Sequence, residues 1–240
     1  MNKSIVVLIV GLVCLTVWLT IYMLSYSNMY IKNKLTLFMS SVFGLPVSYS
    51  YSVLATVIYC LLPLISCFVL GKVAGFQVSQ LFSFAYGWRT LLVILLAVIG
   101  VMSVMAVFLM IILTISPKMN IQEEMSRIKW IEGIFMVPTK VAWLLPMCSA
   151  CFEEIFFRGA FLKGLLVSGM GTVLAVSIVS IAFIVNQCIL ADTKIQKLVL
   201  GVSSLAISMI GSIAFLSCGS IIPSMIMHAS FAGFYTNGKK

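Results

Sequence analysis

Apolar stretches of about 20 residues recur along this chain, and they limit its fold more than any other feature of the sequence. An α-helix of that length crosses the roughly 30 Å hydrocarbon core of a bilayer, because each residue adds about 1.5 Å. The sequence therefore predicts an integral membrane protein of the all-α class, built as a polytopic transmembrane helical bundle.

The composition excludes a soluble globular domain. Of 240 residues, 62% are apolar and 9% are charged, whereas globular chains carry about 25% charged residues. The formal net charge of +9 does not indicate binding to nucleic acid, because the lysines and arginines are spread thinly between apolar stretches. Basic residues that flank membrane spans face lipid head groups, so the lipid bilayer is the expected partner of this charge.

The apolar pattern predicts seven spans, and an eighth is left open. The first, at about 5–24, is too long for the apolar region of a signal peptide, so we expect an uncleaved span. The segment 35–50 is apolar but broken by Gly44 and Pro46, and it is the candidate for an eighth, short or re-entrant span. The other six spans are predicted at about 51–70, 91–115, 141–157, 172–190, 198–217 and 220–236.

Charge is concentrated in one segment, 116–133, where acidic and basic residues mix with apolar ones. This mixture predicts an amphipathic helix at the membrane interface, with Trp130 near the head groups. A solvated helix that joins two spans fits the same pattern. We accordingly divide the chain into N-terminal transmembrane helices with the interfacial helix, residues 1–140, and a core that carries the polar residues, residues 141–236.

The distribution of basic residues predicts the orientation. With seven spans, most lysines and arginines fall on the side of the C-terminus, which the positive-inside rule places in the cytoplasm. An eighth span would change this count. The expected location is the plasma membrane of a bacterium, because Ile, Lys and Ser are abundant and acidic residues are few.

Two of the six acidic residues, Glu153 and Glu154, are adjacent within the apolar sequence LLPMCSACFEEIFFRGAFL. An ionisable group at membrane depth costs several kcal/mol unless it is paired or wetted. On a helix, Glu154 and Arg158 are four residues apart and can form an ion pair. Glu153 points about 100° away and is free to face a cavity, where a carboxylate can act as a general base or acid. A helix end at the interface, with Arg158 reaching water, is the alternative.

His228 is the single histidine of the chain and lies in another apolar segment. A lone histidine in a span is either a packing residue or a proton relay, ligand or catalytic group. The amides of Asn186 and Gln187 form a third polar point, and amides in spans also bind neighbouring helices. No metal or cofactor is expected, because catalytic zinc usually takes three protein ligands and the chain has a single histidine.

The stretch FEEIFFRGAFL, the amide pair and the late histidine together resemble the CPBP group, also called Abi or CAAX-protease type 2 proteins. The resemblance covers roughly residues 141–236. It implies an all-helical intramembrane endopeptidase in which Glu153 activates a water, supported by Glu154 and Arg158. His228 would be the histidine on the oxyanion side, and the substrate or partner would be a hydrophobic peptide or membrane protein.

Two positions depart from the family pattern. Gln187 stands where the family has a histidine, and an amide cannot take up a proton. Ala232 stands where the family has an asparagine, and loss of one oxyanion donor typically costs about 100- to 1000-fold in rate.

Three functions follow as hypotheses: a weak peptidase, an inactive relative that acts as a scaffold, bacteriocin-immunity or regulatory protein, and a proton-coupled transporter. The transporter has the least support, because the two halves of the chain do not resemble each other.

Overall fold

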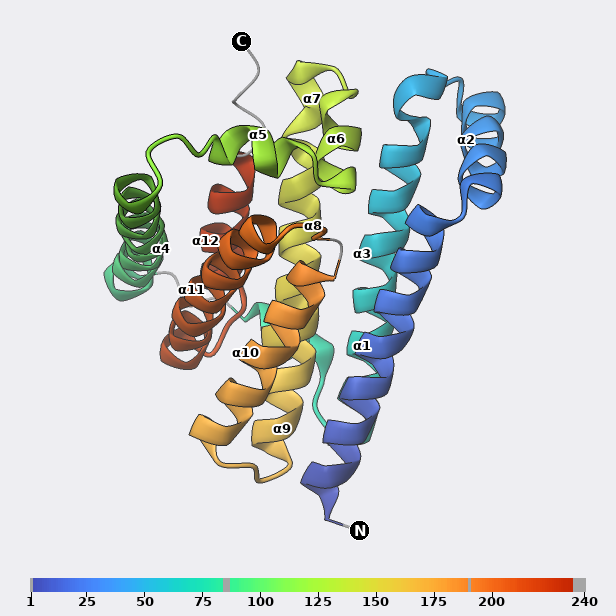
Figure 1. Cartoon of the computed structure of the whole chain (residues 1–240). Coiled ribbons are helices and arrows are strands. Elements are labelled where there is room, and N and C mark those ends of the chain that lie inside the picture. The colour runs from blue at the N-terminus through green and yellow to red at the C-terminus, as the bar shows by residue number, and fades with distance from the viewer. Residues whose placement is uncertain (1, 84–86, 190, 235–240) are drawn as a thin grey trace.

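The computed structural model describes residues 2–83, 87–189 and 191–234, and within these ranges the chain is helical and contains no strand (Figure 1). The all-α prediction is confirmed. The first half of the chain contains α1 (Lys3–Ser27), α2 (Met29–Phe43), α3 (Val47–Ala74), the 3₁₀ turn η1 (Val78–Phe82) and α4 (Trp88–Ile115). The second half contains α5 (Ile121–Ser126), α6 (Lys129–Phe135), α7 (Thr139–Ala142), α8 (Leu144–Glu154), the π-helix η2 (Ile155–Leu162), α9 (Lys163–Val167), α10 (Thr172–Cys188), α11 (Lys194–Cys218) and α12 (Ile222–Phe234).

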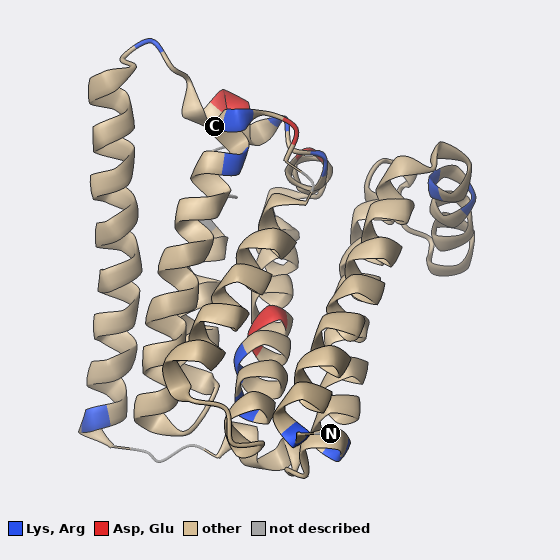
Figure 2. Ribbon diagram, turned by 60° about the horizontal axis from the view of Figure 1, so that its bottom comes forward, with Lys and Arg blue, Asp and Glu red and all other residues tan. Residues whose placement is uncertain are grey.

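Four of the described helices, α1, α3, α4 and α11, are long and apolar enough to cross a membrane. They lie in one bundle with α8, α9, α10 and α12 (Figure 1). Figure 2 shows that most charged residues gather near the ends of the helices, with one acidic and basic group inside the bundle. These four helices are compatible with a membrane protein, as the composition predicts.

Four membrane-length helices are fewer than the seven to eight spans that were predicted. The predicted spans 172–190 and 220–236 correspond to α10, with 17 residues, and α12, with 13 residues. The predicted span 141–157 belongs to a helical rod that continues from Leu144 to Val167, but its winding changes from α to π at Ile155. Residues 190, 235 and 236, at the ends of two predicted spans, lie outside the described residues, as do Lys239 and Lys240.

Two further segments differ from their predictions. The segment 35–50 is not one span, because Gly44 adopts a left-handed conformation with φ of 64° and separates the end of α2 from the start of α3. The segment 116–133 is not one helix. Asn120 caps α5 by accepting a hydrogen bond from the Glu123 backbone N–H at 3.1 Å, and Ile128 is extended and buried before α6 begins.

The segment of α5 and α6 lies across one end of the bundle (Figure 1). It is fastened to the start of α11, where Thr193 and Gln196 form a capping box. The Gln196 side chain also donates a hydrogen bond to the Glu124 backbone carbonyl at 2.9 Å. This bond fixes α5 above the interior of the bundle.

The core is centred on η2, whose residues are all buried. The rings of Phe156, Phe157 and Phe161 are completely buried there. Helix α1 approaches this core at Gly11, where an added Cβ would overlap the Phe161 ring. Close approach of this kind is the usual role of glycine between membrane helices.

Replacing Gly11 with alanine should therefore destabilise the bundle, although alanine is the better helix former. We expect the free energy of unfolding to fall by about 1–3 kcal/mol, the usual cost of overpacking. Gly100→Ala in α4 is the control, because the nearest atom to its added Cβ, Ile210 Cδ1, lies at an ordinary 3.4 Å. Unfolding of the purified proteins in detergent measures both variants. Equal stability of the two would contradict the packing of α1 on η2.

Candidate functional site

The ionisable residues inside the bundle come from three helical segments that meet near its centre. Glu153 and Glu154 end α8, Arg158 lies in η2, and His228 lies in α12. The side chains of Glu154 and Arg158 are completely inaccessible, and Glu153 and His228 are also buried. Buried charges require partners, so the contacts of each group define what it can do.

Glu154 is the centre of a buried ionic network. Its Oε1 atom lies 2.9 Å from Arg158 Nη1 and 2.9 Å from His228 Nδ1. Arg158 in turn donates a hydrogen bond from Nη2 to the backbone carbonyl of Ile207 in α11, at 3.0 Å. Its guanidinium lies over the Phe183 ring of α10, with Cζ 4.7 Å from the ring centre. The arginine therefore connects η2 with α10 and α11, while His228 connects the network to α12.

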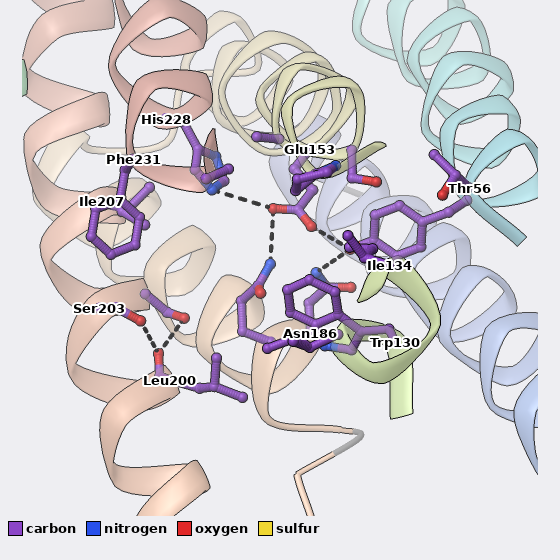
Figure 3. A pocket seen from close by; sticks show the side chains of 18 of the residues that line it. Thr56, Trp130, Ile134, Glu153, Asn186, Leu200, Ser203, Ile207, His228 and Phe231 are labelled. Carbon is purple, nitrogen blue, oxygen red and sulfur yellow. Dashed lines mark hydrogen bonds and ion pairs between the residues drawn. The ribbon is translucent and has the colours of Figure 1, made fainter. Parts of the chain in front are cut away.

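This network orients the imidazole of His228. Glu154 Oε1 lies 2.9 Å from both Arg158 Nη1 and His228 Nδ1, so a proton on Nδ1 is donated to Glu154. Nε2 lies 3.7 Å from Glu153 Oε2, which Figure 3 shows between His228 and Asn186. The second histidine nitrogen is thus aimed at the second glutamate.

Glu153 is held by two neutral donors. The Tyr59 hydroxyl of α3 donates to Oε1, and Gln187 Nε2 of α10 donates to Oε2 at 2.8 Å. The amide of Asn186 donates to the Tyr59 oxygen at 3.0 Å. A chain of hydrogen bonds therefore leads from Asn186 through Tyr59 to Glu153.

Sequence reasoning missed Tyr59. Helix α3 contains three tyrosines, and nothing in the local sequence separates Tyr59 from Tyr49 or Tyr51. Only the packing of α3 against α8 reveals it.

Glu153 lies on the wall of a cavity of about 100 Å³. A buried water needs about 10–15 Å³ of such volume and two to four polar partners, so the cavity has room for several waters or a small part of a ligand. Trp130 and Ile134 of α6 lie on one side of it (Figure 3). The other lining residues that matter here are Tyr22, Tyr59, Asn186, Gln187, Ser203, Ser204, His228 and Ala232.

The structure brings the sequence-predicted residues together in two layers. Glu153, Gln187, His228 and Ala232 line the cavity, and the pair of Glu154 and Arg158 lies behind them. Among the described residues, no group of three or more His, Cys, Asp or Glu side chains is arranged to hold a metal ion. The arrangement can hold a water or a polar group that contacts both the Glu153 carboxylate and the His228 imidazole from the cavity side.

Residues 91–236, more than half of the chain, match the family of unknown function DUF5968. The chain belongs to this family. The part that matches DUF5968 begins inside α4 and includes Glu153, Gln187 and His228, whereas Tyr59 lies outside it. No curated protein and no solved structure matches the chain.

The buried pair yields a direct stability prediction. Arg158→Met leaves the Glu154 carboxylate without its cation, and removing one partner of a buried pair costs about 3–5 kcal/mol. Arg127→Met is the matched control, because Arg127 pairs with Glu123 at 2.6 Å on the surface, where such pairs contribute about 0–1 kcal/mol.

Unfolding in detergent measures both variants, together with Glu154→Gln and the double variant of Glu154 and Arg158. The double variant should lose less stability than the sum of the two single variants, because neither charge is then left alone. Strict additivity would contradict the ion pair.

Proposed function

We propose that this chain is an intramembrane protein of the glutamate-dependent endopeptidase type, which binds a hydrophobic peptide and hydrolyses it slowly. The observation that carries the proposal is the position of Glu153 on the cavity wall, with His228 Nε2 3.7 Å from its Oε2 atom. The resemblance of residues 141–236 to the CPBP group supports the same assignment.

The proposal includes a topology. The rod from Leu144 to Val167, α10 and α12 would cross the membrane together with α1, α3, α4 and α11, which makes seven crossings. The larger share of basic residues then lies on the side of the C-terminus, which would be cytoplasmic. The cavity would lie within the membrane region, where a hydrophobic peptide can reach it.

The chemistry assigned to the site is general-base hydrolysis. A water between Glu153 and His228 gives a proton to the Glu153 carboxylate while its oxygen attacks the carbonyl carbon of the peptide. The carbon–nitrogen bond then breaks, and the proton passes from Glu153 to the leaving amine. Glu154 and Arg158 touch neither water nor peptide and act as positioning residues for His228.

Two features of the cavity wall explain why hydrolysis would be slow. Ala232 has no side-chain donor for the oxyanion, and one such donor is worth about 100- to 1000-fold in rate. Gln187 donates to Glu153 at 2.8 Å, so it stabilises the carboxylate without being able to move a proton. The Tyr59 hydroxyl on the cavity wall is already engaged, because it donates to Glu153 Oε1.

A second function is favoured by the same contacts. Both Glu153 oxygens already accept a hydrogen bond, one from Tyr59 and one from Gln187. A carboxylate whose two oxygens already accept hydrogen bonds is a weaker base. Such a site suits a cavity that binds a peptide without cleaving it, as an immunity or regulatory protein would. The two functions share the cavity and differ in turnover.

Cleavage of a hydrophobic peptide library by the protein in liposomes tests the first function. We expect slow product formation that falls at least about 100-fold in Glu153→Gln, the usual contribution of a general base, and also falls in His228→Ala. Glu132→Gln, on the exposed side of α6, is the matched control and should cleave like the wild type. Cleavage that survives Glu153→Gln would contradict the assignment.

A double variant separates the two functions. Gln187→His with Ala232→Asn restores the donors of the family pattern and should raise cleavage by about 100- to 1000-fold. If the wild type binds peptide without product and the double variant cleaves it, the second function holds. If neither protein binds nor cleaves any peptide, both functions are wrong.

A further inference from the structure

A second and larger cavity lies beside the candidate site. Its volume is about 880 Å³, within the range of pockets that hold drug-sized ligands. One wall is a face of α4, the opposite wall includes Val199 of α11 and Phe231 of α12, and α5 and the segment before it close one end. The α4 residues on the wall are Met102, Met105, Ala106, Leu109 and Leu113.

The walls along the length of α4 are entirely apolar. The residues from α4, with Val199 and Phe231, carry no side-chain hydrogen-bonding group, apart from the weak thioether acceptors of methionine. Met102, Met105, Met119 and Met125 all line the cavity, and methionine adapts its shape to irregular apolar ligands. An extended peptide would leave its backbone amides unpaired here, at a cost of several kcal/mol each. A hydrocarbon chain has no such groups.

The end beneath α5 is polar and carries one cation. Lys118 lines it together with Asn120, Gln122 and Ser126, and no acidic residue is among the lining residues. The two glutamates of α5 are engaged elsewhere: Glu123 pairs with Arg127 at 2.6 Å, and Glu124 accepts a hydrogen bond from Thr193 at 3.2 Å. This end therefore favours a negative charge.

We propose that this cavity binds an acyl chain of an anionic phospholipid, with the phosphate head group at Lys118. The chain would lie between α4 and the facing walls of α11 and α12, and the head group would lie at the level of α5. A lysine near an anionic membrane surface contributes about 1 kcal/mol of attraction, and the apolar walls supply the burial of the chain. This binding does not depend on peptidase activity.

The bound chain would also touch the wall of the candidate site. Met125, Ile131 and Phe231 line both cavities, so these three side chains separate the proposed lipid from the space next to Glu153. A chain in the larger cavity packs against them from behind. The bound chain would therefore hold these three side chains, which form part of the wall of the candidate site, in one conformation.

Thermal unfolding in a neutral detergent, with phosphatidylglycerol or phosphatidylcholine added, tests the proposal. Phosphatidylglycerol should raise the Tm of the wild type along a saturable curve, and phosphatidylcholine should act more weakly. Lys118→Gln should bind phosphatidylglycerol roughly fivefold more weakly. Lys140→Gln, an exposed lysine of α7 that does not line the cavity, should bind like the wild type.

A pair of neighbouring substitutions tests the position of the chain. Ala106→Phe places a ring inside the cavity, in the path of the acyl chain, and should reduce the response to phosphatidylglycerol, while Val107→Phe, on the exposed side of α4, should leave it unchanged. The Tm of each variant without lipid shows whether it folds. Equal effects of the two lipids, or an unchanged response in Ala106→Phe, would overturn the proposal. Stabilisation by a hydrophobic peptide alone, lost in Ala106→Phe, would overturn it in favour of a peptide site.

Discussion

The structure depends on one buried ion pair, that of Glu154 and Arg158. Both side chains are completely shielded, and an unpaired charge at such a place would cost several kcal/mol. Arg158 also bonds the Ile207 carbonyl at 3.0 Å and lies over the Phe183 ring, and Glu154 holds His228 Nδ1 at 2.9 Å. The rod from Leu144 to Val167 is thus fixed against α10, α11 and α12 by two side chains. The π-helix that carries Arg158 begins directly after Glu154, and π-helical turns occur frequently at functional sites.

The two adjacent glutamates lie in different environments, one inside the helix bundle and one on the cavity wall. Glu154 faces the interior network and has a cation as its partner, whereas Glu153 faces the cavity and has the neutral donors Tyr59 and Gln187. His228 links the two, because one ring nitrogen contacts each glutamate. A rigid inner layer that orients a reactive outer layer is the arrangement that preorganised sites require. In the outer layer, Gln187 donates to Glu153 and Ala232 lines the cavity, and neither side chain can take up a proton.

Much of this arrangement could be predicted from the sequence, because it depends on residues that are close together along the chain. The spacing of Glu154 and Arg158 on one helix gives the ion pair directly, and apolar stretches near 20 residues give α1, α3, α4 and α11. The number of membrane-length helices was overestimated, because hydropathy does not show that the rod from Leu144 changes its winding or that α12 is only 13 residues long. Tyr59 and the larger cavity depend on how distant helices pack. Contacts such as that of Tyr59 with Glu153, 94 residues apart, leave no local signal.

The central claim is that Glu154 fixes His228 through Nδ1, so that Nε2 faces Glu153. The chain has a single histidine, so ¹⁵N-histidine labelling with a histidine-free affinity tag gives one imidazole to observe by NMR in lipid nanodiscs. We predict a proton on Nδ1, with Glu153→Gln changing the Nε2 resonance and leaving the Nδ1 proton in place. In Glu154→Gln, the proton should no longer be confined to Nδ1. An Nδ1 without a proton in the wild type, or a ring that responds to neither substitution, would contradict this arrangement.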